Sequence, residues 1–63
     1  MKQPPIKILD EEIDPERFPV LYKWAQTNPE GLASQLKSIS EKNKESVGMS
    51  MVNLESDLRT DNS

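Results

Sequence analysis

The sequence predicts an all-α fold with an extended N-terminal arm, a short helix, a tight turn and a longer amphipathic helix that Gly48 can interrupt. The first observation behind this prediction is the segment Thr27–Glu30, where a turn precedes a proline and an acidic residue, which is typical of a helix start. The second is a set of apolar residues that recur at the spacing of one helical face. They are Leu32, Leu36, Ile39, Val47, Met51, Leu54 and Leu58.

Residues 1–14 are expected to form an extended acidic arm. Pro4 and Pro5 oppose helix formation, and Ile6 to Leu9 alternate only partly, as in a short strand. A single strand of this length is not stable in water and needs the edge of a sheet. The arm therefore either packs a few apolar side chains or adds a strand to a partner or to a second copy of the chain.

The first helix is expected over roughly residues 15–27. Asp14 suits the N-cap position, and Pro15 suits the first helical position. Pro19 complicates this start because it lacks a backbone N–H, so residues 15–18 are either a short turn or part of an interrupted helix. The expected apolar face contains Phe18, Leu21, Trp24 and Ala25, whereas Tyr22 and Lys23 are expected to face outward.

Gly48 leaves two alternatives for the second helix. It can end that helix with a positive φ, with Ser50 then capping a third helix, or it can lie within one long helix. The apolar spacing continues across Gly48 and favours the long helix. In both cases residues 15–60 are expected to form a single small helical domain, with a frayed tail at 61–63.

The composition argues against an enzyme, a metal site and a bound cofactor. The 63 residues include no cysteine and no histidine, so the candidate bases, nucleophiles and ligands reduce to carboxylates, Lys, Tyr and Ser. A chain this short also has little interior for a desolvated site. Such small domains often gain stability from oligomerisation or from a partner.

The charge and the hydropathy limit which partners and which cell compartment we expect. The net charge of −3 makes nucleic acid an unfavourable partner, because such binding depends on cationic side chains. No apolar run approaches the roughly 20 residues that span a membrane, and the start of the chain does not look like a secretory signal. We therefore expect a small acidic protein of the cytoplasm. Its carboxylates cluster at Asp10, Glu11, Glu12, Asp14 and Glu16, either as a solvated linker or as a patch for a basic partner.

The predicted function is a small protein-interaction module, such as a regulator, adaptor or inhibitor, that docks an apolar helical face on a larger protein. The helical stripe looks too narrow to form a core alone, so we expect the free chain to self-associate or to be only partly folded. Trp24 is the strongest candidate anchor because tryptophan buries a large apolar area. The residues expected to bind the partner are Phe18, Leu21, Trp24, Leu32, Leu36, Ile39, Met51, Leu54 and Leu58.

Two alternatives stay open. Residues 44–54 can be read as a helix-turn-helix with Gly48 in the turn, which predicts a small dimeric DNA-binding regulator. The acidic Glu55 and Asp57 in the following helix weaken that interpretation. The chain can also be a subunit of a structural homo-oligomer.

Overall fold

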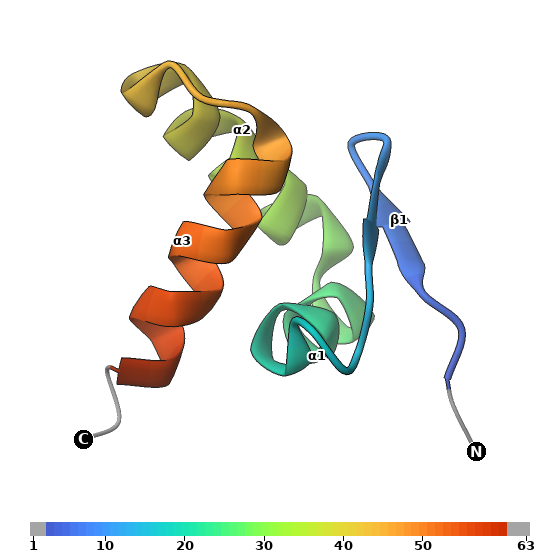
Figure 1. Ribbon diagram of the computed structural model, residues 1–63. Coiled ribbons are helices and arrows are strands. Elements are labelled where there is room, and N and C mark those ends of the chain that lie inside the picture. Colours follow the sequence, from blue (N-terminus) through green and yellow to red (C-terminus); the bar gives the residue numbers. More distant parts are fainter. Residues whose placement is uncertain (1–2, 61–63) are drawn as a thin grey trace.

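A computed structural model describes residues 3–60 and shows three helices beside a short hairpin (Figure 1). The expected helical character is confirmed, but the N-terminal part also contains a small antiparallel sheet. The predicted tail at 61–63 lies outside the described residues. The elements are β1 (Ile6–Ile8), β2 (Glu11–Ile13), α1 (Pro19–Thr27), α2 (Pro29–Asn43) and α3 (Val47–Thr60).

The hairpin corrects the expectation of an extended arm. Strands β1 and β2 pair with each other, with Ile6 opposite Ile13 and Lys7 opposite Glu12. Because side chains alternate along a strand, Ile6, Ile8 and Ile13 share one face. Ile8 and Ile13 are buried in the core shared with the helices. The strand therefore finds its sheet partner within the chain, and the helices supply the apolar cover that an isolated hairpin lacks.

Helix α1 begins at Pro19, four residues later than expected. Residues 15–17 form a turn, which the Phe18 amide closes by donating to the Asp14 carbonyl at 2.8 Å. Proline is well suited to the first helical turn, where an amide has no partner within the helix. The expected outward orientation of Tyr22 is wrong, because its side chain is buried and its hydroxyl donates to the Pro4 carbonyl at 2.7 Å.

The turn between α1 and α2 is the tight one that the sequence predicts. Asn28 is the N-cap of α2, and its side-chain oxygen accepts the Gly31 amide at 3.0 Å. The Asn28 amide also donates to the Trp24 carbonyl at 2.7 Å. One residue therefore ends α1 and begins α2, which leaves no room for a flexible linker.

The break between α2 and α3 falls at Lys44, and both alternatives for Gly48 are wrong. Lys44 has a φ of 56°, and the following Glu45 amide donates to the Ser40 carbonyl at 3.0 Å, as in a Schellman ending. Gly48 lies in the first turn of α3 without a positive φ. The turn proposed for a helix-turn-helix at residues 47–50 is therefore part of a helix.

Side chains around Glu45 fix the α2–α3 connection. Its carboxylate accepts hydrogen bonds from the Ser50 hydroxyl at 3.0 Å and from the side-chain nitrogen Nδ2 of Asn53 at 3.1 Å. The Ser40 hydroxyl donates to the Glu45 carbonyl oxygen. Ser46 accepts the Met49 amide at 3.3 Å and so caps the start of α3. These bonds hold the two helices at a defined angle across a three-residue connection.

All elements contribute to one core. Each helix contacts the other two, and α1 also contacts β1. The core therefore covers most of the helical stripe within a single chain, and whether the free chain also self-associates or binds a partner through it stays a prediction. The buried apolar residues are Ile8, Ile13, Phe18, Leu21, Tyr22, Ala25, Leu32, Leu36, Met51 and Leu54.

Candidate functional site

The residues predicted to bind a partner lie in or against the core. Six of them are buried and three are half-buried, so in this conformation they pack against one another and do not form an open docking face. Whether any of them also contacts a partner stays a prediction. The buried residues are Phe18, Leu21, Leu32, Leu36, Met51 and Leu54, and the half-buried ones are Trp24, Ile39 and Leu58.

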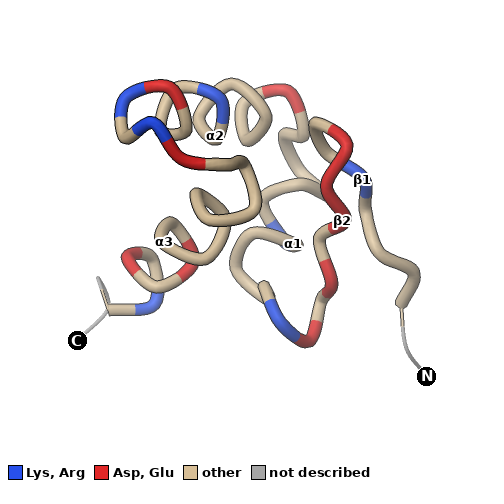
Figure 2. Tube along the Cα trace, turned by 45° about the horizontal axis from the view of Figure 1, so that its top comes forward, with Lys and Arg blue, Asp and Glu red and all other residues tan. Residues whose placement is uncertain are grey.

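Charged residues are distributed unevenly along the fold (Figure 2). Acidic residues follow one another along the hairpin and the connection to α1, from Asp10 to Glu16. The second half of α2 and the residues just after it lie on the opposite side of the molecule (Figure 2). This segment contains both lysine and glutamate, namely Lys37, Glu41, Lys42, Lys44 and Glu45. The acidic side is therefore the more uniform of the two.

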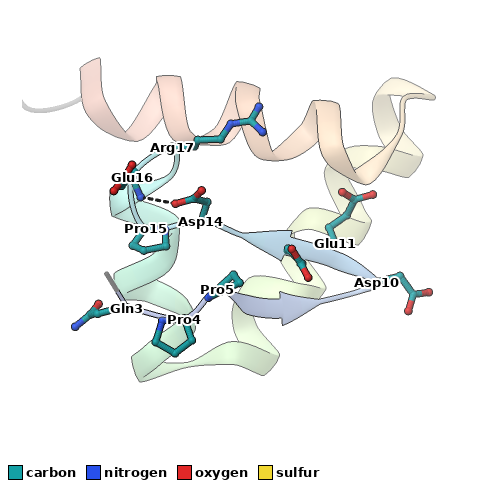
Figure 3. Close-up of a pocket in the computed structure, with 10 residues that line it drawn as sticks. Gln3, Pro4, Pro5, Asp10, Glu11, Asp14, Pro15, Glu16 and Arg17 are labelled. Atoms are coloured by element: carbon teal, nitrogen blue, oxygen red, sulfur yellow. Dashed lines mark hydrogen bonds between the residues drawn. The ribbon is translucent and has the colours of Figure 1, made fainter. Parts of the chain in front are cut away.

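An acidic groove runs along this side (Figure 3). Pro4 and Pro5 lie next to the segment that carries Asp14 and Glu16, and the Glu16 amide donates to Asp14 Oδ1 at 2.8 Å. The hydrogen bond from Tyr22 to the Pro4 carbonyl holds the proline-rich wall in place. The lining residues are Gln3, Pro4, Pro5, Asp10, Glu11, Glu12, Asp14, Pro15, Glu16 and Arg17.

The end of the hairpin, formed by Leu9 and Asp10 and called here the hairpin tip, has an unusual backbone. Both residues have positive φ values, 50° and 66°. A two-residue hairpin turn of this type favours Asn and Gly, because a leucine in the left-handed region places its Cβ against the backbone. Leu9 is nevertheless 40% exposed. The chain thus keeps a large apolar side chain in solvent at a position where its backbone preference is poor.

A second hollow, the α1–α3 groove, lies between the start of α1 and the outer side of α3. Its volume is about 370 Å³. Val52 is 46% exposed, and the guanidinium of Arg17 lies 5.4 Å from the centre of the Phe18 ring. The groove therefore combines apolar surface with arginine. Its lining residues are Arg17, Phe18, Val52, Glu55, Ser56, Arg59 and Thr60.

Glu55 is the one buried carboxylate among residues 3–60, and its contacts assign it a structural role. It accepts the Leu21 amide at 3.0 Å and the Val20 amide at 3.4 Å. Phe18, the N-cap residue of α1, has no side-chain cap of its own, so Glu55 supplies the missing acceptor from α3. Arg59 lies 3.8 Å from the same carboxylate, one turn further along α3.

The described residues hold no arrangement suited to metal binding or to spanning a membrane. Within residues 3–60, no three His, Cys, Asp or Glu side chains are grouped as metal ligands. No helix in this part of the chain is long and apolar enough to cross a bilayer. Every buried side-chain nitrogen or oxygen there has a hydrogen-bond partner. The described surface carries carboxylates, lysine and arginine side chains, and a few exposed apolar side chains.

Comparisons of this chain with protein-family models, with curated proteins and with solved structures find no match. The functional argument therefore depends on the surface alone. Sequence reasoning identified the acidic cluster but missed the hairpin tip and the α1–α3 groove. The tip had little local signal, because Glu11 and Glu12 are not strand-forming residues and Leu9-Asp10 is not a usual hairpin-turn pair. The groove had none, since it depends on how α1 and α3 pack.

Proposed function

We propose that this chain is a non-catalytic protein-interaction module, a regulator, adaptor or inhibitor, that docks on a larger protein through its hairpin tip and acidic groove. The observation that carries the proposal is the exposed Leu9 with its positive φ. The sequence-based hypothesis used the helical stripe for docking. Because the core uses most of that stripe, the proposed docking surface moves to the hairpin.

The backbone conformation and the exposure of Leu9 both cost free energy. A non-glycine residue in the left-handed region costs about 1–2 kcal/mol, and asparagine or glycine would lower that cost. Leu9 is 40% exposed, so its burial within the chain offsets this cost only in part. Non-glycine residues held in such sparsely populated backbone regions cluster at functional sites. A partner that buries Leu9 would supply the missing compensation.

The charges next to Leu9 indicate which chemistry the partner surface should have. Asp10 and Glu12 are exposed, and the Asp10 carboxylate points outward at the end of the hairpin (Figure 3). A complementary surface has a small apolar pocket for Leu9 and a rim of lysine or arginine. Such a rim would raise the rate of association more than the final affinity, and salt would weaken the complex.

An affinity experiment in extracts of the source cells tests this proposal. The bait is the whole chain as wild type, as Leu9→Asn and as Lys23→Asn, and mass spectrometry identifies the retained proteins. Leu9→Asn keeps the turn, because asparagine accepts a positive φ, but it removes the apolar side chain. Lys23 is exposed on α1, outside both the tip and the acidic groove, and so provides the control.

We expect one protein to be retained by the wild type and by Lys23→Asn but lost with Leu9→Asn. If all three baits retain the same proteins in equal amounts, the tip is not the docking surface and the proposal fails.

The other proposals have less support on the surface. The DNA-binding alternative lacks a cationic surface on α3. The exposed residues of this helix include Asp57 and Arg59, and cationic residues do not form a stripe along it. Salt-dependent retention on DNA tests it. A cytoplasmic location remains a proposal, for which the lack of cysteine is compatible support.

A further inference from the structure

The α1–α3 groove and the hairpin tip are complementary in chemistry, although they lie on different parts of the same chain. The groove is lined by two apolar residues, Val52, which is 46% exposed, and the buried Phe18. Its rim carries Arg17 and Arg59, both of which are exposed. A suitable occupant therefore has one apolar side chain with carboxylates next to it.

The acidic Glu55 in the groove does not oppose such an occupant. Its side chain is only 5% exposed, and its carboxylate accepts two backbone amides at the start of α1. Arg59 contacts this carboxylate at 3.8 Å, yet its own side chain is 62% exposed. Among the residues that line the groove, the exposed charged side chains are consequently Arg17 and Arg59.

The hairpin tip has the features that this groove requires. Leu9 is 40% exposed and stands next to the exposed carboxylate of Asp10, with Glu12 two residues further on. The hollow has a volume of about 370 Å³, which leaves room for a leucine side chain. The match therefore combines apolar surface and charge.

We propose that the hairpin tip of one copy of this chain docks in the α1–α3 groove of a second copy. The contact joins two different surfaces, so it is heterologous, and each added copy presents a free tip and a free groove. The interface is small, and its dissociation constant is expected to be on the order of 1 mM. Self-association then occupies the same tip that the proposed partner needs, and the two modes of binding compete.

Sedimentation of the full chain over a range of concentrations tests this inference. The weight-average mass should rise above that of one chain as the concentration approaches about 1 mM, and added salt should reverse the rise. Val52→Glu places a carboxylate among the residues that would receive Leu9, and we expect it to lower the association constant at least tenfold. Circular dichroism verifies the fold of each variant.

Met49→Glu is the matched control. Met49 is 54% exposed on the same helix, one turn before Val52, and it does not line the groove. The control should associate as the wild type does. A chain that remains monomeric at every concentration would overturn the inference, and so would equal effects of the two substitutions.

Mixing two variants provides the sharpest test. Leu9→Glu keeps the groove and Val52→Glu keeps the tip, so each variant alone should stay monomeric. Their mixture should form dimers and stop there, because only one productive contact remains. A mixture without dimers contradicts the inference. Since Val52→Glu leaves the tip intact, its retention of a larger partner in cell extracts tests the proposed function separately.

Discussion

Single residues decide where the helices of this small protein begin and end. Its two glycines, Gly31 and Gly48, have different roles at such helix starts. Gly31 lies beside the N-cap of α2, and a Cβ placed on it would lie 2.6 Å from the side-chain nitrogen of Asn28. Gly48 lies in the first turn of α3, where an added Cβ would lie 3.6 Å from Glu11 Oε1. The first approach is too close for an unchanged cap, whereas the second is an ordinary contact.

Gly48→Ala should therefore stabilise the fold by about 0.5–1 kcal/mol, because alanine loses less conformational freedom in a helix than glycine. Gly31→Ala, the matched substitution, should not give this gain, since the Asn28 side chain must move and the loss of an N-cap costs about 1 kcal/mol. Chemical denaturation of both variants measures the difference. A lower denaturation midpoint for Gly48→Ala would contradict the placement of this residue inside α3.

At the scale of the elements, two helix boundaries have causes that the local sequence does not reveal. The start of α1 depends on Glu55, which is distant in the chain, and the end of α2 depends on a positive φ at a lysine. The sequence correctly predicted the turn at Asn28 and the helix that follows, because a side-chain cap and a proline are local signals. It allowed a second break at Gly48, because glycine is the usual residue with positive φ, but it favoured a continuous helix there. The break instead uses Lys44, at a cost that the surrounding hydrogen bonds of Glu45 and Ser40 compensate.

Tertiary contacts also explain what the sequence could not show about the candidate site. The acidic cluster was visible as composition, but its groove exists only because β2 pairs with β1 and Tyr22 binds the Pro4 carbonyl. Leu9 and Val52 were hidden among other apolar residues of the chain. Their exposure becomes evident only once the core has been assigned to the remaining apolar side chains.

Helix α1 should depend on Glu55 for its start. Glu55→Ala leaves the Leu21 amide buried without its acceptor, which should cost about 1–3 kcal/mol in the free energy of unfolding. Glu55→Gln keeps an acceptor oxygen but loses the charge at the helix N-terminus, so its cost should be smaller, at about 0.3–1 kcal/mol. Thermal unfolding ranks the two variants. Equal losses would mean that the charge, and not the hydrogen bond, holds the start of α1.

On the scale of the whole molecule, the hairpin and the helices should unfold as one unit. The hairpin and the helices share one hydrophobic core, since Ile8 and Ile13 belong to the same cluster as Leu21, Leu36 and Met51. A small domain of this size has only a few kcal/mol of net stability, so the loss of one buried side chain is a large fraction of the total. An N-terminal arm that did not contribute to the core would unfold without changing the stability of the helices.

Ile13→Ala distinguishes these two situations. Ile13 is fully buried, and truncating such a residue to alanine costs about 2–5 kcal/mol. Because the hairpin shares its core with the helices, the substitution should lower the unfolding midpoint of the helical circular-dichroism signal, although residue 13 lies outside every helix. Lys7→Ala, at an exposed position of the paired strand, should change that midpoint little. If Ile13→Ala leaves the helical transition in place, the hairpin is dispensable for the core and the arm predicted from the sequence is the better description.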